Sequence, residues 1–165
     1  MSSLWSHQQH ALNITVKQNF KSGTHAHATG TGKSILGHAI IRAFSHLYPN
    51  RLMIWLCEQT SVIHDIFSRK HSREGILVCD CVSKKPKDWW SSVQSSLIWK
   101  VPVLVIINRA FLVSQKRFLK LTYSTIGLII HDECHSGIGE TTKVFYTWLA
   151  EAHPEASVIG LSATP

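Results

Sequence analysis

The sequence predicts an α/β fold in which a mainly parallel sheet carries helices on both faces. Short runs of apolar residues, typical of strands buried on both faces, recur along the 165 residues. Segments with a helical spacing of apolar residues lie between these runs, and such crossover segments join parallel strands. Apolar residues make up 44% and charged residues 16% of the chain, a balance typical of one globular domain.

The first half of the chain begins with a helix and a short strand. His7–Phe20 carries apolar residues on one helical face, and a Thr24–Ala28 strand leads into a glycine-rich loop. An amphipathic helix is expected at Ser34–His46, and the continuous apolar run Leu52–Cys57 predicts a buried strand. The remaining elements of this half are a helix at Thr60–Arg69 and a strand at Gly75–Cys79.

The second half continues the alternation after a polar stretch. Ser83–Asp88 holds three lysines and a proline, which predicts a surface loop, and Asp88 can cap a helix that runs to Trp99. Further elements are strands at Val103–Ile107, Ile126–Ile130 and Ser157–Leu161, and helices at Ala110–Leu121 and Thr142–Ala152. Because the strands are parallel, their carboxyl ends are expected to meet at one edge of the sheet.

Charge and targeting signals narrow the functional classes. The net charge of +7 and the pI near 9.4 favour a polyanionic partner, most commonly nucleic acid. No apolar run approaches the roughly 20 residues that span a bilayer, and Met1–Trp5 lacks the order of a signal peptide. We therefore expect an intracellular protein, cytoplasmic or nuclear and not secreted, without a membrane partner. The Cys-x-Cys at Cys79 and Cys81 has no second pair at zinc-site spacing, so buried thiols are expected.

A glycine-rich loop at Ala28–Ser34 lies between a predicted strand and a predicted helix. Glycines let backbone N–H groups face phosphate oxygens, and the helix adds its positive N-terminal end. In a nucleotide site Lys33 would reach the β- and γ-phosphates, and Ser34 would bind Mg²⁺. The strict pattern G-x-x-x-x-G-K-[ST] has a histidine, His27, at its first glycine, so a glycine-rich turn with a solvated lysine is the alternative. The residues expected to contact the nucleotide are Thr29, Gly30, Thr31, Gly32, Lys33 and Ser34.

Two adjacent carboxylates, Asp132 and Glu133, follow the apolar run Gly127–Ile130. Such a pair at the end of a buried strand repels itself unless a cation compensates. In a magnesium site Asp132 would hold the metal, usually through water, and Glu133 would polarise the attacking water. A surface turn with two solvated acids is the alternative. A phosphate loop and an acidic pair that both follow strands would meet at one sheet edge, which favours the catalytic interpretation.

Together these residues resemble superfamily 2 helicases of the DExH kind. His27–Ser34 resembles motif I, often A-T-G-T-G-K-T, in which the strict first glycine is commonly absent. Asp132–His135 resembles motif II and Gly160–Pro165 resembles motif III, with the motor subunits of type I and III restriction enzymes most similar. The resemblance covers nearly the whole chain and implies a RecA-like P-loop domain. It implies that residues 1–165 form the first lobe, ending at motif III, with the second lobe absent.

Weaker matches add candidate residues. Leu4–Leu12 resembles the segment before motif I, where Gln8 takes the place of the glutamine that reads adenine. Ile54–Gln59 resembles motif Ia. The other roles implied by the resemblance are nucleic-acid backbone contacts at Asn108 and Arg109, and coupling of nucleotide state to strand contacts by His135, Ser162 and Thr164. The alternatives are a surface glutamine, a histidine with a local hydrogen bond, and a turn hydroxyl.

Lysine-rich segments are further candidates for strand contacts. Lys116 and Lys120 share a face of a predicted helix, and three lysines precede Trp89 and Trp90. A solvated helix face and tryptophans packed into the core are the alternatives.

The implied activity is ATP hydrolysis coupled to movement along DNA or RNA. ATP and Mg²⁺ would bind between this lobe and a second RecA-like lobe, supplied in cis or in trans, which brings arginines to the γ-phosphate. We therefore expect the isolated chain to bind Mg–ATP weakly and to hydrolyse it poorly. The alternatives are a P-loop enzyme of another class, such as a kinase or GTPase, and a non-catalytic remnant that binds nucleotide or nucleic acid only.

Overall fold

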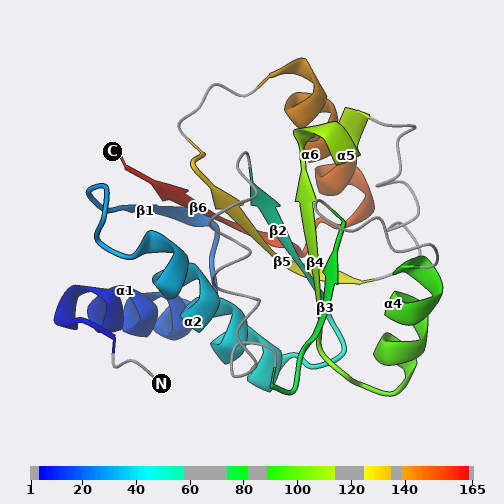
Figure 1. Cartoon of the computed structure of the whole chain (residues 1–165), viewed down its shortest axis with the longest axis horizontal. Coiled ribbons are helices and arrows are strands. Elements are labelled where there is room, and N and C mark those ends of the chain that lie inside the picture. Colours follow the sequence, from blue (N-terminus) through cyan, green and yellow to red (C-terminus); the bar gives the residue numbers. More distant parts are fainter. Residues whose placement is uncertain (1–3, 58–73, 82–88, 114–124, 135–138, 164–165) are drawn as a thin grey trace.

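The computed structural model describes residues 4–57, 74–81, 89–113, 125–134 and 139–163. These residues form a six-stranded sheet in the order β1-β6-β5-β2-β4-β3, and every pair of neighbouring strands is parallel (Figure 1). The predicted α/β fold with a parallel sheet is therefore confirmed. No helix within these described ranges is both long and apolar enough to cross a membrane.

The strands alternate with the helices along the chain. The strands are β1 (Gly23–Ala26), β2 (Leu52–Cys57), β3 (Leu77–Asp80), β4 (Val103–Asn108), β5 (Ile126–Asp132) and β6 (Ser157–Ser162). The helices are α1 (Ser6–Lys17), α2 (Lys33–Leu47), α4 (Trp89–Ile98), α5 (Arg109–Val113) and α6 (Glu140–Ala152). The predicted helix at 60–69, the loop at 83–88 and the end of the helix predicted to reach residue 121 lie outside the described residues.

The main differences from the predicted elements occur at their ends. Helix α1 ends at Lys17, because Asn19 and Phe20 have φ angles of 52° and 57° and turn the chain so that Phe20 is fully buried. Strand β1 ends at Ala26, two residues earlier than predicted, where the chain leaves the sheet for the glycine-rich loop. Strand β5 runs on to Asp132, so the acidic motif begins inside the sheet.

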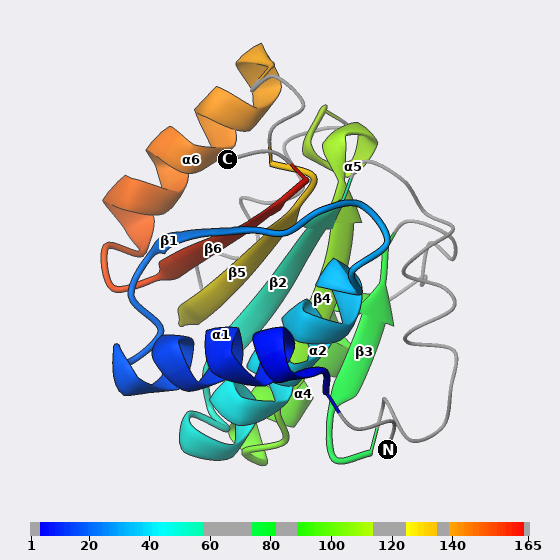
Figure 2. The same ribbon diagram turned by 90° about the vertical axis from the view of Figure 1, so that its left-hand side faces the viewer.

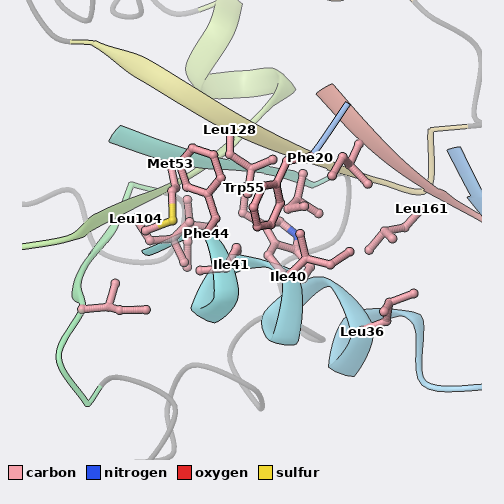
Figure 3. Close-up of a cluster of buried hydrophobic side chains, with 14 of the residues drawn as sticks. Phe20, Leu36, Ile40, Ile41, Phe44, Met53, Trp55, Leu104, Leu128 and Leu161 are labelled. Carbon is pink, nitrogen blue, oxygen red and sulfur yellow. The ribbon is translucent and has the colours of Figure 1, made fainter. Parts of the chain in front are cut away.

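Alternating side chains of the strands divide the core into two layers. Helices α1 and α2 cover one face and α4, α5 and α6 cover the other (Figures 1 and 2). In β2, Met53 and Trp55 point toward α2, whereas Leu52 and Ile54 belong to the cluster on the opposite face. Figure 3 shows Trp55 among the side chains of α2.

Close packing of α2 on the sheet depends on two glycines. A Cβ atom at Gly37 would lie 2.6 Å from Cη2 of Trp55 and 2.9 Å from Cδ1 of Leu161. A Cβ atom at Gly127 in β5 would lie 2.6 Å from Cζ of Phe44, next to a register shift between β2 and β5. The two contacts fix α2 against the sheet and set where its first residue, Lys33, lies.

Candidate nucleotide site at the carboxyl edge of the sheet

The glycine-rich loop curls between β1 and α2. Gly30 and Gly32 have φ angles of 80° and 74°, a left-handed conformation that favours glycine. Inside the curl, the Thr31 hydroxyl donates to the Ala28 carbonyl at 2.6 Å. Helix α2 begins immediately after Gly32, so its positive N-terminal end opens onto the loop, an arrangement suited to an anion.

Gln8 on α1 binds the backbone carbonyl groups of this loop. Its side-chain amide donates to the carbonyls of Thr31 at 2.9 Å and Gly32 at 3.2 Å, and its carbonyl oxygen accepts from the Trp5 N–H at 2.9 Å. The side chain is buried, and a Cβ atom at Gly32 would collide with it. Both ends of the carboxamide therefore bind protein, and the adenine-reading role of Gln8 stays a prediction that requires these bonds to change.

Lys33 and Glu133 bring the two main motifs together. Lys33 Nζ lies 3.6 Å from Glu133 Oε1. The lysine is buried at 8% exposure, whereas 42% of the Glu133 side chain is exposed. Glu133 also has a φ of 56°, a left-handed conformation that is uncommon outside glycine and that turns the chain at the end of β5. The expected meeting of the phosphate loop and the acidic motif at one sheet edge is thus observed.

Asp132 is buried at the end of β5, next to Glu133. Burial and the neighbouring Glu133 carboxylate raise its pKa, while the Glu133 backbone N–H, Lys33 and the Trp55 indole act in the opposite direction. An ionised Asp132 therefore gains from additional positive charge, which a magnesium ion would supply. No three histidine, cysteine or acidic side chains cluster as metal ligands among the described residues. Mg²⁺ is often held by one or two carboxylates together with water and phosphate oxygens, so Asp132 and the half-buried Ser34 fit such an ion.

Strand β6 lies between the two motifs and bonds to both. Ala26 of β1 is in register with Ser162, and Asp132 of β5 with Leu161. Beyond these pairs, the His27 N–H donates to the Ser162 carbonyl at 3.0 Å, and the Cys134 N–H donates to the Leu161 carbonyl at 3.2 Å. The buried Ser162, predicted to couple nucleotide state to strand contacts, thus lies between the phosphate loop and the acidic motif.

Several other predicted residues lie elsewhere or outside the description. Asn108 ends β4, where its side-chain oxygen accepts from the Phe111 N–H at 2.9 Å and caps α5, so its nucleic-acid role stays a prediction. Arg109 begins α5, but its side chain is outside the described structure, as are His135 and Thr164. Trp90 is half-buried and packs against the cluster on the α4 face, as the core alternative predicts.

The sequence did not predict two groups of polar side chains near this edge. His7, His25 and His27 form a row of rings beside the phosphate loop. On the other face of β5, the Tyr146 hydroxyl lies 2.7 Å from Nδ1 of the buried His131. Burial, followed by Cys134, raises the pKa of Tyr146, which therefore stays neutral. His25-x-His27 was visible as a pattern, but His7 joins it only because α1 docks on the loop.

Comparison with known proteins agrees with this arrangement. The family model described as the Res subunit of type III restriction enzymes matches residues 2–165. Among curated proteins, Endoribonuclease Dicer homolog 3b of rice, Oryza sativa subsp. japonica, is 25% identical in an alignment of 153 residues that covers 83% of this chain and 9% of that protein. The chain therefore spans about a tenth of the length of this relative.

Similar solved structures share the fold. A nuclease-deletion mutant of the Type ISP restriction-modification enzyme LlaGI, in complex with a DNA substrate mimic, has a TM-score of 0.69 at 16% identity and covers 99% of this chain and 18% of its own. The Sulfolobus solfataricus SWI2/SNF2 ATPase core with dsDNA has a TM-score of 0.66 at 17% identity, covering 99% and 32%. The UvsW helicase from bacteriophage T4 has a TM-score of 0.65 at 17% identity, covering 98% and 52%.

Proposed function

The chain belongs to the family of type III restriction enzyme Res subunits, as an ATP-binding lobe of the helicase and translocase type, and from this premise we propose that it binds Mg–ATP and couples hydrolysis to movement along DNA or RNA. The observation that carries the proposal is the contact of 3.6 Å between Lys33 Nζ and Glu133 Oε1. A lysine at the start of a helix, a glycine-rich loop and two adjacent carboxylates then lie together at the carboxyl edge of a parallel sheet.

Each residue has a distinct role in this proposal. The loop from Thr29 to Gly32 encloses the phosphates with its backbone N–H groups, and Lys33 neutralises the β- and γ-phosphate charge. Ser34 and Asp132 would hold Mg²⁺, which would offset the negative charge of the phosphates. Glu133, whose side chain is partly exposed, orients the attacking water and accepts its proton.

The pairing of Lys33 with Glu133 also suggests a resting state. Without nucleotide, the lysine neutralises the carboxylate that later accepts a proton. When the triphosphate draws Lys33 toward its own oxygens, Glu133 is released to act on water. Because Lys33 exchanges the Glu133 carboxylate for phosphate oxygens, the buried lysine has a negatively charged partner in both states.

A second RecA-like lobe, in cis or in trans, completes the proposed site. The related structures are much longer than this chain, which covers 18%, 32% and 52% of them. The exposed residues Ala28, Thr29 and Gly30 leave one side of the phosphate loop open to such a lobe. An arginine from it would raise the hydrolysis rate by about 10³–10⁵. The free cysteines of this chain also fit an intracellular location, cytoplasmic or nuclear.

Titration of the chain with Mg–ATP tests the proposal directly. Lys33→Ala removes the buried cation that faces the phosphates, and Lys143→Ala removes an exposed lysine of α6 as a matched control. We expect Lys33→Ala to weaken Mg–ATP binding at least tenfold, since a charge-assisted hydrogen bond contributes about 1.5–3 kcal/mol. Lys143→Ala should bind as the wild type does.

Two outcomes would contradict the proposal. Equal binding of Mg–ATP by the wild type and Lys33→Ala would favour a remnant that does not use the phosphate loop. Tighter binding of GTP than of ATP would favour a P-loop enzyme of another class. Stimulation of ATP hydrolysis by single-stranded or duplex DNA, measured with the second lobe present, would separate a motor from a simple nucleotide-binding domain.

A further inference from the structure

The acidic pair lies at the end of β5, where the strand loses one of its two neighbours. β5 pairs with β2 as far as Leu56 and His131, whereas its pairing with β6 continues to Asp132 and Leu161. Glu133, the next residue, has a φ of 56° and lies beyond the end of the strand. The backbone at Asp132 is therefore held by strand pairing on one side only.

His131 and Asp132 point to opposite faces of the sheet, because successive side chains of a strand alternate. Ile129 belongs to the buried cluster on the α6 face, and Ile130 belongs to the cluster on the α2 face. His131 therefore points toward α6, in agreement with its contact to Tyr146, and Asp132 points toward the α2 face. A twist of the strand end would displace both side chains together.

Tyr146 anchors this strand end from α6. Its hydroxyl lies 2.7 Å from Nδ1 of the buried His131, and the centroids of the two rings are 5.8 Å apart. The preceding residue, Phe145, is fully buried, and Tyr146 packs against the same cluster, so the helix is fixed to the sheet at this point. The hydrogen bond thus connects a packed helix with the residue directly before Asp132.

Cys134 brings the chain back to the α6 face on the other side of the acidic pair. Its N–H donates to the Leu161 carbonyl at 3.2 Å. A Cβ atom at Gly160 would lie 2.7 Å from Cys134 Sγ, so the thiol packs directly on this glycine, which is the register partner of His131. The acidic pair is therefore flanked by two residues, His131 and Cys134, that are both held on the α6 face.

We propose that Tyr146 is a positioning residue for the magnesium site, and that through His131 it keeps the Asp132 carboxylate in the orientation that binds the ion. This inference rests on the proposed function. A carboxylate ligand binds a metal more tightly when its orientation is fixed before the ion arrives, and the groups that fix it commonly contribute a large factor in affinity. Tyr146 itself would contact neither nucleotide nor ion, because it lies on the opposite face of the sheet from the Asp132 side chain.

The dependence of ATP affinity on magnesium measures this positioning. We define the magnesium gain as the dissociation constant of ATP in excess EDTA divided by that of ATP in saturating Mg²⁺. Calorimetric titration of the chain, well below its unfolding temperature, gives both constants. A loss of folded protein lowers both apparent affinities alike, so it cancels in this ratio. Asp132→Asn removes the proposed ligand and sets the lowest value of the gain.

Tyr146→Phe removes the hydroxyl and keeps the ring. Tyr48→Phe is the matched control, because the Tyr48 hydroxyl also donates to a side chain, Oδ1 of Asn19 at 2.6 Å, but Tyr48 lies just before β2, at the opposite edge of the sheet. We expect Tyr146→Phe to lower the magnesium gain about tenfold and to leave the affinity in EDTA unchanged. Tyr48→Phe should have the gain of the wild type.

A double variant separates positioning from stability. His131→Phe/Tyr146→Phe replaces both partners of the hydrogen bond by apolar rings, so no buried imidazole is left without its partner. Urea unfolding should therefore show that the double variant is more stable than Tyr146→Phe. We expect its magnesium gain to remain low, because the hydrogen bond that holds the strand end is still missing.

Three results would overturn the inference and leave nucleotide binding by the phosphate loop in place. The first is an unchanged magnesium gain in Tyr146→Phe. The second is a full gain in the double variant, which would show a structural role only and which decides alone if Tyr146→Phe does not fold. The third is a wild type that binds ATP equally well with and without Mg²⁺. Failure of the wild type to bind ATP under either condition would instead refute the proposed function.

Discussion

Replacement of Gly37 by alanine tests how tightly the position of α2 is set by its packing on the sheet. The added methyl group would lie 2.6 Å and 3.1 Å from Cη2 and Cζ3 of Trp55 and 2.9 Å from Cδ1 of Leu161. Neither neighbour can retreat easily, because both side chains are fully buried. The helix must therefore shift away from the sheet, and Lys33, one turn earlier, must shift with it.

Two terms of opposite sign set the size of the effect. Alanine in place of glycine favours a helix interior by about 0.8–1.0 kcal/mol. Overpacking of a dense core costs about 1–3 kcal/mol. The overpacking term is expected in the upper half of its range, at about 2–3 kcal/mol, because all three distances are shorter than van der Waals separation, so it exceeds the helix term by about 1–2 kcal/mol. We therefore expect Gly37→Ala to lower the free energy of unfolding by about 1–2 kcal/mol and to weaken Mg–ATP binding.

A double-mutant cycle isolates the cause. Trp55→Phe removes the ring atoms that the new methyl group would meet, at a cost of about 1–3 kcal/mol for a core truncation. If the clash with Trp55 is responsible, the double variant Gly37→Ala/Trp55→Phe is more stable than the sum of the single effects by about 1 kcal/mol or more. Urea unfolding followed by circular dichroism measures all four proteins. Additive effects, or a Gly37→Ala protein as stable as the wild type, would refute the reasoning.

Three other variants or probes test the surroundings of the site. Asp132→Asn should raise the free energy of unfolding at neutral pH, because burial raises the pKa of Asp132 and disfavours its ionised form. Urea unfolding should show that this gain vanishes in acid, where Asp132 is protonated. A loss of stability at neutral pH would contradict the prediction. Tyr146→Phe should cost about 1–2 kcal/mol in urea unfolding, because it leaves Nδ1 of the buried His131 without its 2.7 Å partner; an unchanged midpoint would show that water replaces the hydroxyl. Burial raises the pKa of the Cys79 thiol to about 11, so thiol reagents at about pH 8 should label Cys79 only when the chain unfolds, and later than the partly exposed Cys134. Mass mapping of the labelled cysteines measures this order, and early labelling of Cys79 would contradict its burial.

The elements that were predicted to the residue are those whose boundaries are local. Leu52–Cys57 matches β2 at both ends, because a continuous apolar run is flanked by polar residues. The end of α1 was predicted three residues too late, because Phe20 continues the apolar pattern of the helix but lies beyond its end. Its ring packs against Phe44, with centroids 5.0 Å apart, and the chain turns through left-handed residues to reach that position. Such a contact depends on a distant helix and leaves no local signal.

The same distinction holds within the site. The meeting of Lys33 with Glu133 was predictable, because parallel strands bring their carboxyl ends to one edge. The bonds from Gln8 to the loop carbonyls were not, because the resemblance places the glutamine near a nucleotide but does not fix its partners in the empty site. The docking of α1 decides those partners, and with them the place of His7.

The position of β6 has a consequence for how the protein is made. Among the described strands β6 comes last in sequence, yet it is the neighbour to which β1 pairs and one of the two neighbours of β5. During synthesis on the ribosome, the segment that carries the phosphate loop and the segment that carries the acidic motif both emerge before the strand that joins them. A nascent chain cannot join the two segments through β6 until Ser162 has left the exit tunnel. Capture of nucleotide by ribosome-bound intermediates would therefore mark the addition of β6 to the sheet.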